Sequence, residues 1–197
     1  NHLSVALNED QQVIVEKNER DERNHSEHLD PLIDEILKGN KLTLKDIDRF
    51  AVAIEPGSYT GLRIGITTVK MFASILDKEV VGISTLQAFA KGVAGDALVI
   101  AGLDARNDNY FAGGYKSGDI PENVILDGHY NIDALIKAIQ EYAAENEVKK
   151  IVFVGSGLEK QDEKIKALNI PYEYGDDDQN VIHAGLIGKL AVSATPI

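Results

Sequence analysis

Short apolar segments alternate along this chain with longer segments whose apolar residues recur every three or four positions. Segments of the first kind are typical of buried β-strands, and those of the second kind are typical of helices that cover a sheet. Their alternation predicts an α/β protein in which helices flank a mixed sheet.

The first half of the chain is predicted to begin with a hairpin and to continue with two further strands separated by helices. Its predicted strands are "LSVAL", "QVIVE", "FAVAI" and "VVGI", and its predicted helices cover 26–38, 60–76 and about 85–93. The chain opens on Asn1, directly before a strand-like segment. We therefore expect it to be a fragment that lacks its first strand.

The second half of the chain nearly repeats the order of strands and helices of the first half, if the missing first strand is counted. Its predicted strands are "ALVIAGL", "NYFAGGY", "NVIL" and "KIVFVG", and its predicted helices cover about 132–145, 158–168 and a last segment from Val181. The repetition lies in the order of elements and not in the residues. We expect two lobes, an N-terminal lobe over 1–95 and a C-terminal lobe over 96–197.

The overall charge limits the partners that the chain can hold by itself. Thirty-two acidic residues against 20 basic ones give a net charge of −12. A protein that grips nucleic acid is expected to show a basic face, so tRNA would be reached only through a partner. Acidity that only aids solubility is the alternative. The absence of cysteine and of a long apolar segment predicts a soluble, cytoplasmic protein without disulfides.

The turn "EPGSYTGLR" resembles a phosphate-binding loop but fails the known patterns. The residues five and six positions after Gly57 are Leu62 and Arg63, where a Walker loop needs glycine and lysine. A nucleophile elbow needs glycine two positions before its serine, and Pro56 stands at that position before Ser58. Two interpretations remain: Ser58, Thr60 and Arg63 hold an anion, or Thr60 caps the helix that follows. We favour the cap.

The helix predicted over 60–76 carries more apolar surface than one sheet needs. A polar sector of roughly 60° holds Arg63, Thr67, Lys70 and Ser74, with apolar residues on both flanks. Either the helix is buried within its own domain, or one apolar flank is kept for another chain. One flank consists of Leu62, Ile66, Val69, Ala73 and Leu76, and the other of Ile64, Met71 and Ile75.

No complete catalytic or metal-binding set is visible in the sequence. His25 and His28 are three positions apart, whereas a zinc-binding H-E-x-x-H motif separates its histidines by four. Asp104 and Arg106 end a predicted strand, where they could supply a catalytic acid, although a local pair that shapes the turn is favoured. The acidic run "GDDDQN" could hold a cation, but a solvated loop is favoured. We expect no catalytic residue and no metal site.

Three stretches resemble the best-marked segments of the TsaB (YeaZ) family. They are "EPGSYTGLRIGITTVKMFA", "VVGISTLQAFA" and "LDARNDNYFAGGY", and their order and spacing also match. The resemblance runs from Asn1 to about Gly157, and its first motif is the most specific. Glu55 stands where the family usually has glycine.

The resemblance implies an actin-like, duplicated ATPase fold of the ribonuclease H-like class, with two mixed-sheet lobes and flanking helices. It also implies a non-catalytic subunit of the complex that makes N6-threonylcarbamoyladenosine (t6A) in tRNA. Its partners would be the catalytic subunit TsaD and the ATPase TsaE, or a second copy of the chain when alone. It implies no tightly bound cofactor, with nucleotide or Mg²⁺ only in the complex with partners.

In this family the two helices that match 26–38 and 60–76 form the partner surface. The expected interface residues are Leu29, Leu32, Ile33 and Ile36 on the first helix, and Leu62, Gly65, Ile66 and Val69 on the second. The alternatives are an active ATPase or sugar-kinase-like enzyme of the same fold, and a peptidase.

Overall fold

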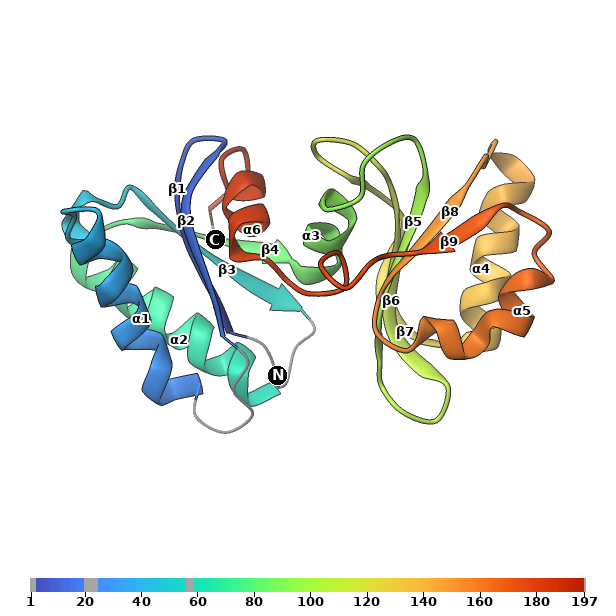
Figure 1. The fold of residues 1–197 in the computed structure, drawn as a ribbon, viewed down its shortest axis with the longest axis horizontal. Coiled ribbons are helices and arrows are strands. Elements are labelled where there is room, and N and C mark those ends of the chain that lie inside the picture. The colour runs from blue at the N-terminus through green and yellow to red at the C-terminus, as the bar shows by residue number, and fades with distance from the viewer. Residues whose placement is uncertain (1–2, 20–24, 56–58, 197) are drawn as a thin grey trace. The chain divides into compact units, whose positions relative to one another are not determined.

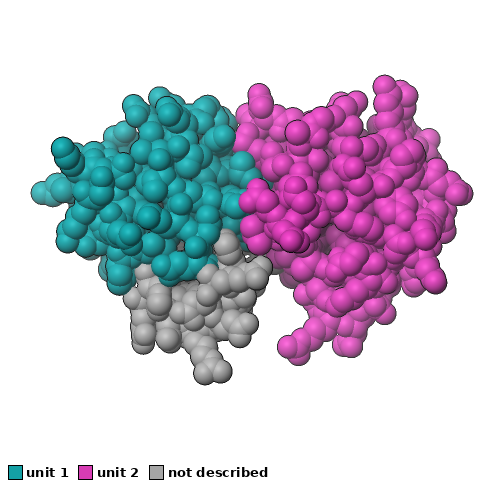
Figure 2. All heavy atoms as spheres, viewed as in Figure 1, with its two compact units in different colours: residues 1–88, 182–197 teal, residues 89–181 magenta. Residues whose placement is uncertain are grey.

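The structure is a computed structural model that describes residues 3–19, 25–55 and 59–196, with the backbone alone at 25–28, 54–55 and 59–65. These residues form two compact units (Figure 2). Unit 1 comprises 1–88 together with 182–197, and unit 2 comprises 89–181.

Unit 1 contains two separate pairs of strands (Figure 1). The antiparallel pair is β1 (Leu3–Glu9) with β2 (Gln12–Glu19), and the parallel pair is β3 (Arg49–Glu55) with β4 (Glu79–Ser84). The helical elements of this part of the chain are α1 (His25–Gly39), η1 (Leu44–Asp46), α2 (Tyr59–Leu76), α3 (Thr85–Lys91) and α6 (Ala184–Ala191). The boundary between the units falls within α3.

Unit 2 contains one five-stranded mixed sheet in the order β7-β6-β5-β8-β9. Strands β5, β6 and β7 form an antiparallel meander, whereas β5, β8 and β9 run parallel. The strands are β5 (Leu98–Asp104), β6 (Asn109–Lys116), β7 (Glu122–Asn131), β8 (Ile151–Gly155) and β9 (Tyr172–Tyr174). The helical elements are α4 (Ile132–Glu145), η2 (Leu158–Gln161) and α5 (Asp162–Lys166).

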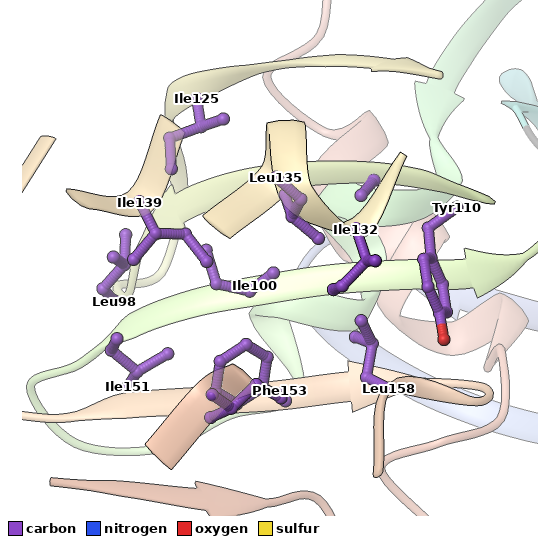
Figure 3. Packing of buried hydrophobic residues seen from close by; sticks show 12 residues of the cluster. Leu98, Ile100, Tyr110, Ile125, Ile132, Leu135, Ile139, Ile151, Phe153 and Leu158 are labelled. Carbon is purple, nitrogen blue, oxygen red and sulfur yellow. The ribbon is translucent and has the colours of Figure 1, made fainter. Parts of the chain in front are cut away.

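The core of unit 2 forms where α4 packs against the sheet (Figure 3). Leu135 and Ile139 of α4 are fully buried against a cluster that includes Ile100 and Phe153. The Asn131 side chain caps the helix by accepting a hydrogen bond from the Asp133 amide at 3.0 Å. Burying each large aliphatic side chain contributes about 1.5–3 kcal/mol, so this helical stripe is a main source of the stability of unit 2.

The predicted hairpin, the helices over 26–38, 60–76 and 132–145 and the buried strands are all present, with ends shifted by a few residues. Three features of the C-terminal part differ from the expectation. The helix expected over 158–168 is a short 3₁₀ turn followed by five α-helical residues, and β9 had not been predicted. The last helix packs in unit 1, so the C-terminal segment does not belong with the lobe that precedes it.

The placement of α6 has a visible physical cause. A Cβ atom added to Gly185 would lie 2.8 Å from the side chains of Val13 and Glu16, and one added to Gly188 would lie 2.5 Å from the Asn8 amide. These two glycines therefore let the helix approach the β1–β2 hairpin closely. At the C-terminal end of α6, the Arg49 guanidinium donates to the carbonyl oxygens of Ala191 and Ala194, both at 2.8 Å. These hydrogen bonds fix that end of the helix to β3.

Candidate partner-binding surface

Helices α1 and α2 contact each other in unit 1 (Figure 1), with α1 against β1 and β2 and α2 against β3 and β4. On α1, Leu32 and Ile36 are each 4% exposed. They pack in the interior of unit 1, which corrects the expectation that they lie on a partner surface. Leu29 and Ile33 are half-buried. Leu32 and Ile36 belong to the apolar stripe of α1, which packs against β1 and β2. One stripe cannot face both these strands and a partner.

One flank of α2 faces the interior of unit 1. Ala73 is buried, and Ile66 and Val69 are half-buried. The ring of Phe72 lies 6.0 Å from that of Phe50 on β3, centroid to centroid. This flank therefore takes part in packing within the unit through Ala73, and a partner contact at Ile66 and Val69 stays a prediction.

The opposite flank of α2 is open. Met71 is 48% exposed and Ile75 is 73% exposed, and the two residues lie one helical turn apart on the same side. Lys70 and Ser74, from the predicted polar sector, are exposed beside them. A single exposed apolar residue is common on protein surfaces. Two neighbouring exposed apolar residues on α2, whose other flank packs within unit 1, mark a candidate contact surface.

The turn before α2 is only partly described. Ser58 lies outside the described residues. Helix α2 begins at Tyr59, so Thr60 and Arg63 lie within its first two turns, and Thr60 does not occupy the position before the helix. Leu62 and Gly65 also lie within the helix. The proposed anion or capping role of this turn stays a prediction.

A second group of polar residues gathers where β5 and β8 end in unit 2. Asp104 accepts a hydrogen bond from the Arg106 amide at 2.9 Å and pairs with the Lys160 ammonium at 3.0 Å. The Arg106 amide, and then Lys160, hold the pKa of the Asp104 carboxyl below its usual value. The Asp104 amide donates to the Ser156 hydroxyl at 3.1 Å. The carboxylate thus shapes the turn, and Arg106 contributes through its backbone.

Buried hydrogen bonds support this strand-end group. The Tyr110 hydroxyl donates to the Gly157 carbonyl at 2.6 Å. The Gln161 amide donates to Asp108 at 2.8 Å and to the Tyr110 hydroxyl at 3.3 Å. Gly155 has a positive φ of 115°, and a Cβ there would collide with the Gly102 carbonyl. The glycines of "VGSG" therefore allow β5 and β8 to meet at this edge. Sequence reasoning missed Gln161 and Lys160, which carry no local signal.

A third polar group joins α6 to β2. The His183 ring nitrogen Nδ1 lies 2.7 Å from Glu16 Oε2, and the Gly185 amide donates to Glu16 Oε1 at 2.8 Å. Burial raises the pKa of Glu16, but hydrogen bonds from Asn18, His183 and the Gly185 amide together lower it below its ordinary value. Glu16 and His183 are 167 positions apart, so the sequence gives no sign of this pair.

The acidic run at 175–180 closes on itself. The Asp176 carboxylate accepts from the Gln179 amide at 2.8 Å, and the Gln179 side chain accepts from the Asp176 amide at 2.9 Å. Within residues 3–19, 25–55 and 59–196 no group of three or more histidines and carboxylates is placed to hold a metal ion. In the same ranges no helix is both long enough and apolar enough to cross a bilayer.

Comparison with known proteins places the chain in a family. The family model described as "TsaD: tRNA N6-adenosine threonylcarbamoyltransferase" matches residues 14–179. The tRNA threonylcarbamoyladenosine biosynthesis protein TsaB of Bacillus subtilis is 30% identical over 164 residues, which cover 81% of this chain and 69% of that protein. The chain belongs to the TsaB (YeaZ) family.

Other TsaB proteins match over a shorter region. TsaB of Escherichia coli is 33% identical over 97 residues, which cover 48% of this chain and 42% of that protein. The solved structure of YeaZ from Pseudomonas aeruginosa superposes with a TM-score of 0.76 at 22% identity, covering 96% of this chain and 85% of that chain. This likeness confirms the expected α/β fold.

Proposed function

We propose that this chain is a non-catalytic subunit in the synthesis of t6A in tRNA and that it pairs with a TsaD-like catalytic subunit. Membership of the TsaB family supports the pathway. The names of its relatives refer to t6A biosynthesis, and the matching family model is that of the threonylcarbamoyltransferase.

The observation that best supports pairing with a TsaD-like subunit is the exposed flank of α2 formed by Met71 and Ile75. The family resemblance implies a partner surface on two helices, which correspond to α1 and α2. On α2, Ile66 and Val69 are half-buried within unit 1, and over 66–76 Met71 and Ile75 are the large apolar residues most open to a partner. Burying both would remove apolar area from water and favour association.

The same proposal includes a TsaE-like ATPase as a further partner, a cytoplasmic location and contact with tRNA only through partners. The net charge of −12 supports the indirect contact, because phosphate backbones repel an acidic surface. Nucleotide or Mg²⁺ would bind only in the assembled complex. When no partner is present, the same flank would support a homodimer.

The test places a charge on the open flank. Met71→Glu and Ile75→Glu are expected to weaken binding to the TsaD-like protein of the same organism by at least about tenfold, since a buried unpaired charge costs several kcal/mol. Ser74→Glu adds the same charge on the same helix outside the apolar flank and serves as the matched control. Binding is measured by isothermal titration, and t6A in cellular tRNA by mass spectrometry.

The thermal melt of each variant separates loss of binding from loss of folding. Weaker binding with an unchanged melt supports the docking surface. Full binding and full t6A levels in the Met71→Glu, Ile75→Glu double variant would overturn it. Normal t6A in cells that lack the chain altogether would overturn the proposed pathway itself.

A further inference from the structure

A groove of about 460 Å³ lies between strand β7 and helix α4 of unit 2. Its size falls within the range of about 300–1,000 Å³ that is usual for sites that bury a ligand or a long side chain. Val124 and Leu126 of β7 and Ala138 of α4 contribute apolar surface to it. All its lining residues belong to one uninterrupted described segment, so the groove is formed entirely within unit 2.

A bulge in β7 exposes an apolar side chain at this groove. Leu126 and Asp127 stand where the partner strand β6 has only Gly113. The Asp127 carboxylate accepts a hydrogen bond from the buried Tyr115 hydroxyl at 2.5 Å, whereas the Leu126 side chain is 78% exposed. Bulges redirect side chains at the edges of sheets. The bulge therefore leaves an uncovered leucine at the groove.

The same bulge opposes the addition of another strand to β7. This strand is the edge of the five-stranded sheet. The Leu126 carbonyl already accepts a hydrogen bond from the Tyr130 hydroxyl at 2.6 Å. Burial, and then the Asp127 charge, raise the pKa of the Tyr130 hydroxyl, so it stays protonated and keeps donating. An irregular edge with an occupied carbonyl disfavours strand pairing, so a molecule that binds here is recognised by side chains.

The charged groups at the groove are all acidic. Glu141 and Glu145 lie one turn apart on α4, and none of the described residues that line the groove is lysine, arginine or histidine. Glu141 is paired only with the exposed Lys137, at 4.0 Å, and such a pair is weak in water. Within the described parts of the chain the Glu145 carboxylate has no hydrogen bond or ion pair. Both carboxylates can therefore receive a cation from outside.

Two aromatic rings favour the same charge. Tyr130 from β7 and Tyr142 from α4 are half-buried and line the groove together with the two glutamates. The face of a tyrosine ring attracts a cation, and a guanidinium group stacks on it while its fork of donors binds carboxylates. A long aliphatic stem can pack along apolar surface while its charged end reaches such groups.

We propose that the groove between β7 and α4 is a docking site for an apolar segment of another protein that carries an arginine. The arginine stem would lie along the apolar lining, and its guanidinium group would reach Glu141 and Glu145. Apolar neighbours of the arginine would cover Leu126, which a small cation by itself would leave in water. A second copy of this chain, with a net charge of −12, and a nucleic acid would both be repelled by the two carboxylates.

This site goes beyond the proposed function and is independent of it. The proposed partner surface is the Met71–Ile75 flank of α2 in unit 1, whereas the groove belongs to unit 2. Substitutions in the groove should therefore leave binding to the TsaD-like protein unchanged.

The probe is a synthetic peptide of sequence "SWLRLS" with blocked ends. The chain contains no tryptophan, so tryptophan anisotropy reports the peptide alone. The control peptide carries citrulline in place of arginine, which keeps the shape and removes the charge. We expect the arginine peptide to bind one-to-one and to shift the amide resonances of 124–130 and 138–146. The citrulline peptide should bind at least about tenfold more weakly.

Variants of the intact chain test the two halves of the proposal. Leu126→Ser, and the double variant Glu141→Gln, Glu145→Gln, should each weaken binding of the arginine peptide at least about threefold. The double variant Glu122→Gln, Glu163→Gln removes the same charge from exposed positions of unit 2 outside the groove, and it should bind normally. All the replaced side chains are exposed, so each thermal melt should stay unchanged.

Four results would overturn the proposal. The first is the absence of shifts at 124–130 and 138–146 with about 1 mM arginine peptide. The second is equal binding of the citrulline peptide. The third is an equal loss in the Glu122→Gln, Glu163→Gln control, which would indicate general attraction to an acidic surface. The fourth is binding of blocked arginine amide as tight as that of the peptide, which would indicate a site for a small cation.

Discussion

Replacing Arg49 by methionine is expected to release the C-terminal helix from unit 1. The Arg49 Nη1 atom donates to the carbonyl oxygens of Ala191 and Ala194, both at 2.8 Å, at the end of α6. The Nε and Nη2 atoms of the same side chain bind Glu79 at 3.0 and 2.7 Å. Methionine keeps much of the aliphatic length and loses every one of these donors.

The loss of stability expected for Arg49→Met follows from how exposed the groups bonded to Arg49 are. A hydrogen bond from a charged donor contributes about 1.5–3 kcal/mol when it is shielded from water, and less where water can replace it. The Ala191 residue is buried and Ala194 is half-buried, so the two carbonyl bonds together contribute about 3 kcal/mol. The Glu79 side chain is 55% exposed, and an ion pair of this kind adds about 0.5 kcal/mol.

Urea unfolding followed by hydrogen exchange measures the change in each unit separately. Because the chain forms two units, a single midpoint would not describe it. We expect the Arg49→Met variant to lose about 3 kcal/mol in unit 1, with early exchange of α6 amides, and no change in unit 2. The matched control is Glu79→Gln, which removes the ion pair and keeps both carbonyl bonds, and it should lose about 0.5 kcal/mol.

Equal losses in the two variants would refute this reasoning, because the carbonyl bonds would then contribute nothing beyond the ion pair. A loss that appeared in unit 2 would refute the assignment of α6 to unit 1.

Four further predictions concern both units. Ile139→Ala should destabilise unit 2 by about 2–5 kcal/mol in urea unfolding, because the side chain is fully buried, and a loss below about 1 kcal/mol would contradict the packing described. Gly155→Ala should prevent unit 2 from folding, as judged by its exchange protection, since the added Cβ would collide with the Gly102 carbonyl; a normally protected variant would show that the turn can rearrange. The pKa of Glu16 is lowered in the folded state, so its contribution to stability is present above its unfolded pKa of about 4.3 and is lost as pH falls through the folded value. Glu16→Gln should therefore flatten the acid limb of the unit 1 stability curve, and an unchanged limb would exclude the contacts with His183 and the Gly185 amide as its cause. The isolated chain should not bind tRNA at physiological salt, and a filter-binding midpoint tighter than about 1 μM would contradict its acidic balance.

The spacing of apolar residues was sufficient to predict the helices that bury a single face. Helix α4 is the clearest case, because Leu135 and Ile139 lie on one buried stripe and the charged residues of the helix are all exposed. The same reasoning could not choose between the two apolar flanks of α2. Both flanks satisfy the helical period, and only the position of β3 shows that Ala73 faces inward while Ile75 faces outward.

Other features left no local trace in the sequence. Strand β9 has three residues, which is too short for alternation to show. The strand-end group of unit 2 depends on Gln161, an ordinary polar residue that meets Tyr110 across 51 positions. Likewise, the position of α6 depends on glycines that fit the first hairpin and on one arginine in β3. Contacts of this kind are set by the tertiary fold and not by neighbours along the chain.

The return of α6 to the first strands has a consequence for the way the chain matures during synthesis. The ribosome releases β1 before unit 2, yet the Ser4 hydroxyl of β1 bonds to the Ala184 amide, which follows 180 residues later in the chain. Unit 2 is one continuous segment between β1 and α6, and it has a hydrophobic core of its own. It can therefore complete its folding before α6 is available to unit 1. The strands of unit 1 thus emerge before unit 2 but complete their packing after it, and until then these apolar strands depend on protection by other means.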